Sequence, residues 1–285
     1  MYYDITNPDV SYYWLHKTLQ IKKDEFIETY IIECHNDFDT FYEKYRSIID
    51  KIDIENLEIV AFQVTSSSNE CAEIKKHGLH NLQWVLSNDT TLNRFLKNNN
   101  ITFDIESKLM YINDIAYDVD YEKYNDLDVI SKRKEQLHKI GHKIYYDFQI
   151  NAFLFCKDIY DYSTIHEAPE FLYTLSLLNK ATKEIDLKWK NICKPYVVKF
   201  KSKLKDFAYS TFYGSEREYI KDRQDNWSDL RRLLILRAVE SAFSDSASQI
   251  FAYMKPNTVI KPENIIEYVP AEKWRKNVLK YFGKE

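Results

Sequence analysis

Glycine is scarce in this chain: four glycines occur among 285 residues, whereas an average protein contains about 7% glycine. Neither the G-x-G-x-x-G dinucleotide motif nor the G-x-x-x-x-G-K-[ST] phosphate loop is present. A nucleotide bound by this chain would therefore be held by side chains and strand edges. Two of the glycines, Gly78 and Gly214, lie in the two segments that carry most of the functional information.

The composition predicts a protein with a substantial core, because 45% of the residues are hydrophobic and 15% are aromatic. The four cysteines are widely spaced and form no C-x-x-C motif, which favours reduced thiols and predicts no metal site. The first residues lack a basic region followed by an apolar run, and no stretch of about 18 apolar residues occurs. We therefore expect a cytoplasmic protein without membrane contact.

Charge is unevenly distributed along the chain, although the net charge is only −4. Residues 1–128 are strongly acidic, and residues 129–237, which include Lys199 and Lys201, are basic. A basic region can meet the phosphates of a nucleotide or a nucleic acid. Alternatively, these lysines form a solvated face that the acidic first half neutralises.

The hydrophobic pattern predicts an α+β domain with a mixed sheet over residues 54–285, and a helical N-terminal extension over residues 1–53. The expected strands cover residues 57–64, 152–156, 196–200, 208–212, 249–253 and 259–260. A hairpin turn is expected at Asn113-Asp114. The longest expected helices cover residues 126–148 and 228–243.

The first informative segment is a strand that ends in Gln63-Val-Thr65-Ser66-Ser67. Gln63 and Thr65 alternate with Val64, so both point to one face and can bond a ribose or a carboxamide. Ser66 and Ser67 precede a short helix, where hydroxyl and N–H groups can bind phosphate. The alternative is an ordinary loop between strand and helix, in which the Ser and Asn residues only cap the helix.

The second segment contains Tyr213-Gly214-Ser215-Glu216-Arg217-Glu218. If it is extended, Glu216 and Glu218 share one face. One carboxylate can then stabilise a developing cation and the other can act as a base, while Tyr213 stacks on a flat ring. The alternative is a surface stretch of neighbouring ion pairs.

A third candidate is His166, which lies next to Glu167 just before a helix that Pro169 opens. It can bind a phosphate or position a base. The alternative is that both residues cap the helix. A further interpretation is a metal-independent ribonuclease that uses His166, Glu167 and basic side chains.

Three segments, in this order along the chain, resemble ADP-ribosyltransferase-like bacterial toxins and abortive-infection proteins. They are residues 62–65 (Phe-Gln-Val-Thr) with the helix ending in Gly78-Leu79, residues 212–219 (Phe-Tyr-x-x-Glu-Arg-Glu-Tyr) and residues 259–265 (Val-Ile-x-Pro-Glu-x-Ile). The chain departs from the family pattern at Gln63, where the family has His or Arg, and at Tyr219, where it has Trp.

The resemblance implies a split sheet of the ADP-ribosyltransferase type and an NAD-dependent toxin or phage-defence effector. Gln63, Glu216 and Glu218 would be catalytic, and Thr65, Ser66, Ser67, Tyr213 and His166 would bind NAD. The acceptor would be a protein or a nucleic acid, and an antitoxin is a possible partner. The basic region over residues 129–237 slightly favours nucleic acid. The alternative is a non-catalytic relative that senses or binds a phage protein or a nucleotide.

Overall fold

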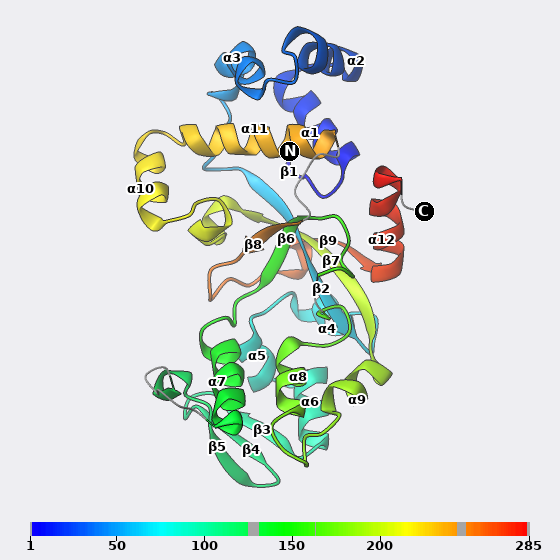
Figure 1. Cartoon of the computed structure of the whole chain (residues 1–285), viewed down its shortest axis with the longest axis vertical. Coiled ribbons are helices and arrows are strands. Elements are labelled where there is room, and N and C mark those ends of the chain that lie inside the picture. The colour runs from blue at the N-terminus through cyan, green and yellow to red at the C-terminus, as the bar shows by residue number, and fades with distance from the viewer. Residues whose placement is uncertain (1, 125–130, 163, 244–248, 284–285) are drawn as a thin grey trace.

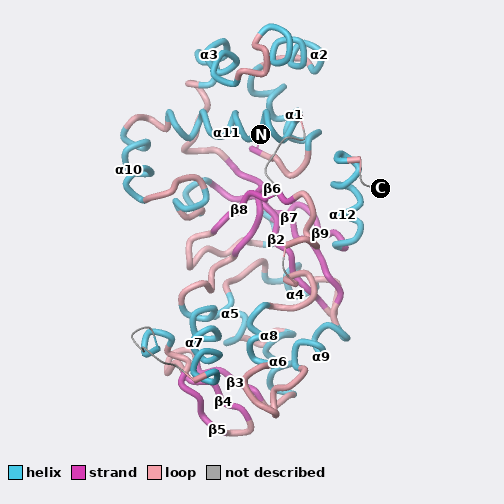
Figure 2. The backbone as a smooth tube through the Cα atoms, in the orientation of Figure 1, coloured by secondary structure: helices cyan, strands magenta, loops and turns pink. Residues whose placement is uncertain are grey.

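A computed structural model describes residues 2–124, 131–162, 164–243 and 249–283 of the chain. The molecule is elongated, with a large sheet near its middle and a small sheet at one end (Figures 1 and 2). Helices cover both sheets, so the predicted α+β class is confirmed. Among these residues, no helix has the length and apolar character needed to span a bilayer.

The large sheet is centred on β2 (Glu58–Ser67), which follows the predicted strand. The strand order is β8 (Gln249–Tyr253), β6 (Asn151–Cys156), β2, β7 (Lys194–Lys203) and β9 (Ile265–Pro270). All of these neighbours pair antiparallel. The sheet is mixed only because β1 (Tyr2–Tyr3) pairs parallel with β2.

The two faces of β2 enter different hydrophobic clusters, because successive side chains of a strand point in opposite directions. Ile59 and Ala61 join the core that also contains the N-terminal helices. Phe62 and Val64 face the other side, where Trp274 packs with its ring centre 4.7 Å from that of Phe62. The N-terminal segment thus shares a core with the sheet.

The helices around the large sheet include α1 (Pro8–Leu19), α2 (Lys23–Ile27), a π-helical turn (Glu28–Glu33), α3 (Phe38–Ile49), α4 (Ala72–His77), α10 (Glu216–Gln224), α11 (Ser228–Ala242) and α12 (Ala271–Leu279). Helices α1 and α11 lie side by side beyond one end of this sheet (Figure 1). Trp274 of α12 packs on the opposite face from the α1–α11 core.

The small lobe has its own hydrophobic cluster. Its sheet is the antiparallel meander β3 (Ile101–Asp104), β4 (Leu109–Ile112) and β5 (Ile115–Asp118). Its helices are α5 (Leu82–Ser87), α6 (Thr91–Asn98), α7 (Lys132–Tyr145), α8 (Glu170–Ser176) and α9 (Ile185–Ile192). The predicted start of α7 at Asp126 falls outside the described residues.

The predicted hairpin at Asn113-Asp114 is confirmed. Ile112 pairs with Ile115, and both turn residues have positive φ, 48° for Asn113 and 62° for Asp114. A two-residue turn with positive φ at both positions matches the twist of the two strands that it joins. Among residues that have a side chain, Asn and Asp tolerate positive φ best.

The extended conformation predicted for the Glu-Arg-Glu segment is wrong. Residues 209–211 form a single 3₁₀ turn instead of a strand, and Glu216 opens helix α10. The hydroxyl of Ser215 accepts a hydrogen bond from the Glu218 N–H, and Glu218 accepts one from the Gly214 N–H. Ser215-x-x-Glu218 is a helix-start signal, and it outweighs the strand pattern before it.

The strand predicted at Val259-Ile260 is also wrong. In the structure, Ile260 makes an isolated bridge to Leu79, and the last strand of the sheet is β9. Gly78, at φ +85°, makes this approach possible: a Cβ on it would lie 2.0 Å from the Ile260 carbonyl oxygen.

Candidate functional site

A cavity of about 530 Å³ lies between the end of the large sheet and the small lobe. The end of β2, the loop that follows it, α4, α5, the end of α7, strands β6 and β8 and the start of α8 line this cavity, which we call the interlobe cleft. These elements meet in the lower half of Figure 1. The volume lies within the range of about 300–1,000 Å³ that is usual for small-molecule sites.

Gln63 and Thr65 line the interlobe cleft. Both side chains are partly exposed and lie on the same face of β2. Neither makes a side-chain hydrogen bond to another residue that the structure describes. An amide and a hydroxyl are therefore available to a bound molecule.

Ser66 and Ser67 also line the cleft, but the structure uses both for local bonds. The Ser66 hydroxyl accepts a hydrogen bond of 2.7 Å from the Trp189 indole N–H. The Ser67 hydroxyl accepts from the backbone N–H groups of Asn69 and Cys71. Both serine hydroxyls therefore serve local bonds, and neither caps α4, whose first N–H, that of Ala72, is bonded by the Asn69 side chain. The capping alternative holds for Asn69 and not for the serines.

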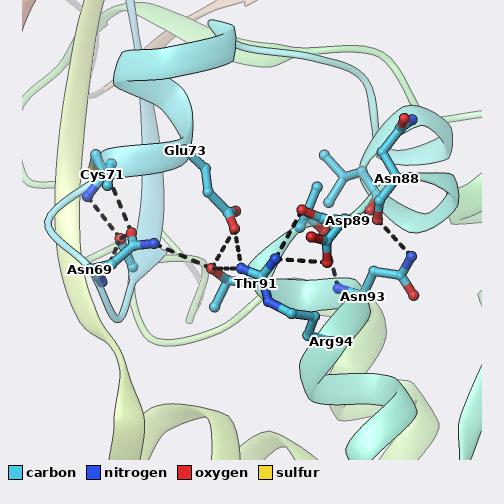
Figure 3. Close-up of polar contacts among 12 residues, drawn as sticks. Asn69, Cys71, Glu73, Asn88, Asp89, Thr91, Asn93 and Arg94 are labelled. Atoms are coloured by element: carbon cyan, nitrogen blue, oxygen red, sulfur yellow. Dashed lines mark hydrogen bonds and ion pairs between the residues drawn. The ribbon is translucent and has the colours of Figure 1, made fainter.

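A polar network forms one rim of the cleft (Figure 3). Arg94 of α6 binds Glu73 at 2.7 Å and Asp89 at 2.8 Å. The Thr91 hydroxyl donates to Glu73, and Asn69 donates to Thr91. The network joins the loop before α4 to the start of α6, and it occupies Arg94 with two carboxylates.

A second charged group lies where α7 meets the start of α8. The Lys143 ammonium lies 2.6 Å from Asp147 and 3.0 Å from Glu170. Burial lowers the pKa of Lys143, but the hydrogen bond and charge of Asp147 and the charge of Glu170 outweigh burial, so the pKa is raised overall. Asp147 also accepts hydrogen bonds from Gln149 and Asn151.

Aromatic rings form much of the apolar wall. His80 stacks on Trp84 with ring centres 3.7 Å apart and planes 14° apart. A further group of rings lines the cleft; it consists of Phe153, Tyr162, Phe251 and Tyr253, and we call it the ring cluster.

Glu216, Glu218 and Tyr213 do not line the cleft. Figure 1 shows α10 beside the end of α11, well apart from α4. The Tyr213 hydroxyl donates to the buried carboxylate of Asp222, at 2.7 Å. The prediction that Gln63 and this segment face one cleft is therefore wrong: Ser215 and Glu218 begin a helix, and Tyr213 anchors it.

His166 does not line the cleft either, although Ile165 and Ala168 do. Its ring stacks on Tyr160, with centres 4.4 Å apart. Burial lowers the pKa of His166, and its Nδ1 has no hydrogen-bond partner among the described residues. The helix α8 begins at Glu170 and has no side-chain cap, so the alternative in which His166 and Glu167 cap it is wrong.

The basic middle of the chain is partly neutralised within the fold. Lys199 binds Asp4 at 2.7 Å, and Lys201 binds Glu58 at 2.9 Å. For these two lysines, the alternative of neutralisation by the acidic first half is correct. No group of His, Cys, Asp and Glu residues that could hold a metal ion occurs within the described ranges.

Sequence reasoning missed Lys143, Asp147, Glu170 and the ring cluster as site residues. Lys143 and Asp147 are four residues apart, which signals an ion pair but not a cleft. The others come from four separate elements that only the tertiary fold brings together.

No family model, no curated protein and no solved structure matches this chain. Functional inference for this chain therefore rests on its own residues and their geometry.

Proposed function

We propose that the protein binds a small ring-bearing molecule, of about nucleoside size, in the interlobe cleft. The observation that carries this proposal is the pair Gln63 and Thr65, whose polar groups lie in the cavity without a protein partner. Both side chains are partly exposed, so neither polar group is committed to another part of the protein. A ligand that takes hydrogen bonds from both, in place of water, therefore gains specificity here.

The walls support a ligand with a flat ring. Trp84, Phe251 and Tyr253 are partly exposed and line the cavity. Aromatic faces of this kind bury a large apolar area and stack on planar groups. The polar groups of Gln63 and Thr65 lie near these aromatic rings in one cavity. This combination suits a ligand that has a flat ring and also carries hydrogen-bonding groups.

A thermal-shift experiment tests this function with adenosine, nicotinamide, NAD and 1-methylquinolinium. A ligand that binds only the folded protein raises its stability as its concentration rises above Kd. We expect at least one compound to stabilise the protein. Gln63→Ala and Thr65→Val should each weaken its binding about fivefold, the equivalent of one hydrogen bond of about 1 kcal/mol.

The matched control is Gln224→Ala, which removes an exposed glutamine of α10 outside the cleft. It should leave binding unchanged. If no compound binds, or if the two cleft variants bind as well as the natural protein, the proposal is wrong.

The second candidate is an NAD-dependent ADP-ribosyltransferase of the split-sheet type, acting as a toxin or phage-defence effector on a macromolecule. One observation favours it: the first and third segments of the resemblance meet at the bridge between Leu79 and Ile260. Gln63 and Thr65 would then contact NAD. Glu216 and Glu218 would have to act from outside the cleft. The geometry therefore supports ligand binding better than it supports ADP-ribose transfer.

The ribonuclease alternative lacks comparable support. His166 packs on Tyr160 rather than lining the cleft, and Glu167 is paired with Lys190 at 2.5 Å.

A further inference from the structure

The interlobe cleft carries more negative than positive charge. Its lining includes four carboxylates: Glu73, Asp89, Asp147 and Glu170. Among the described residues that line it, Lys143 is the single lysine or arginine. Arg94 lies behind the lining and pairs with Glu73 and Asp89.

Each charged group of the cleft therefore has one carboxylate more than it has cations. Lys143 is shared between Asp147 and Glu170, and Arg94 is shared between Glu73 and Asp89. The excess has most effect around Lys143, where the Lys143 and Asp147 side chains are only 26% and 31% exposed, and less at Asp89, which is 83% exposed and screened by water. An excess of carboxylates favours a cation over an anion.

Three rings of the ring cluster, Tyr162, Phe251 and Tyr253, line the same space and are partly exposed, whereas Phe153 is buried. Tyr162 lies edge-on to Phe153, with ring centres 5.2 Å apart, and Phe251 and Tyr253 stack at 5.9 Å. Aromatic faces attract a positive charge within about 6 Å of the ring centre, and the attraction grows when the charge is desolvated.

The ring cluster and the second charged group are neighbours. Burial raises the pKa of Tyr162, and the negative charges of Glu170 and Asp147 raise it further while Lys143 opposes them. Asn151 begins β6, and its side-chain amide donates a hydrogen bond to Asp147. Carboxylates and aromatic rings thus line one part of the cavity.

We propose that this part of the interlobe cleft takes a flat organic cation, meaning a ring that carries a positive charge, in preference to neutral or anionic rings. The inference rests on the proposed ligand-binding function and names its ligand class. It also implies that a dinucleotide is a poor ligand in this part of the cleft, because the two negative charges of its pyrophosphate group would meet the excess of carboxylates.

A matched set of probes tests the inference at pH 7.5: 1-methylquinolinium, neutral quinoline and anionic quinoline-2-carboxylate. All three have the same ring system and differ in charge. We expect 1-methylquinolinium to bind at least tenfold more tightly than quinoline, and quinoline-2-carboxylate to bind most weakly. Ligand-observed NMR titration measures the three dissociation constants.

Variants at two positions separate the contribution of the carboxylate charge from that of the aromatic ring. Glu170→Gln removes a half-exposed carboxylate and should reduce the preference for the cation severalfold while quinoline binds as before. Tyr162→Leu should weaken cation binding more than Tyr162→Phe, which keeps the ring. Glu272→Gln is the matched control, since Glu272 is also paired with a lysine but lies on α12 outside the cleft.

The outcomes distinguish the two proposals. If quinoline binds as tightly as 1-methylquinolinium and Gln63→Ala weakens both, ligand binding stands and the preference for cations is wrong. If 1-methylquinolinium fails to bind, or if Glu272→Gln changes its binding as much as Glu170→Gln does, the inference is overturned. Ligand binding itself is then judged on adenosine and nicotinamide.

Discussion

Gly78 and Gly214 were both prominent in the sequence, but they have different roles. Gly78 has φ +85°, and a Cβ on it would lie 2.0 Å from the Ile260 carbonyl oxygen. The same atom on Gly214 would meet only the Glu218 carboxylate, at 3.4 Å. We therefore expect Gly78→Ala to lower the free energy of unfolding by about 1–3 kcal/mol, and Gly214→Ala to change it by less than about 0.5 kcal/mol.

Urea unfolding of the two variants measures both values. Equal losses, or a larger loss for Gly214→Ala, would show that the contact between Leu79 and Ile260 does not depend on a glycine.

His80 links the cleft wall to the pH dependence of stability. Burial lowers its pKa from the ordinary 6.5, although a hydrogen bond to the His77 carbonyl opposes this. The unfolded chain therefore binds more protons than the folded chain between the lowered pKa and 6.5. The free energy of unfolding must fall as the pH drops from 6.5 through this window.

We expect His80→Gln to reduce that slope, because glutamine does not titrate. Urea unfolding between pH 7.5 and 5 measures it. An unchanged slope in His80→Gln would contradict the assignment, even if the variant is less stable because the stacking on Trp84 is lost.

At the scale of elements, α10 decides between the two candidate functions. Glu218 accepts a hydrogen bond from the Gly214 N–H at the start of this helix, and both Glu216 and Glu218 are exposed. If they only begin a helix, Glu216→Gln and Glu218→Gln should leave ligand binding and any NAD turnover unchanged. If Glu218 stabilises a developing cation, Glu218→Gln should lower turnover about 10²–10³-fold while NAD affinity changes little.

An NAD-hydrolysis assay of the single variants and the double variant distinguishes these outcomes. A large loss of turnover with unchanged NAD affinity would revive the role that the resemblance implies for the Glu-Arg-Glu segment.

The elements that sequence reasoning located correctly are those with a strong local cause. The apolar run of β2, the Asn113-Asp114 turn and the cap at Gly78 each follow from chemistry within a few residues. The prediction for the segment around Glu216 was wrong because Ser215 starts a helix where an extended strand was expected.

At the scale of the whole molecule, the sequence indicates only one part of the candidate site, the polar strand end that carries Gln63 and Thr65. Other parts of the lining come from Lys143, Tyr162 and Phe251, which are distant in sequence and belong to segments that the fold alone brings together. No local pattern contains that information, so the cleft could not be predicted as a complete site.

The protein's tryptophans provide the most direct measurement of where a ligand binds. Trp84 and Trp189 line the interlobe cleft, whereas Trp14, Trp227 and Trp274 do not. Trp227 packs against Tyr219 of α10 and therefore reports on the Glu-Arg-Glu segment. Indole ¹⁵N labelling, with each resonance assigned by a Trp→Phe variant, allows all of these positions to be observed in one titration.

We predict that 1-methylquinolinium, adenosine or nicotinamide, whichever binds most tightly, shifts the indole resonances of Trp84 and Trp189 and leaves that of Trp227 unchanged. A titration that shifts Trp227 while Trp84 and Trp189 stay fixed would place the ligand beside α10 and contradict the interlobe cleft as the binding site.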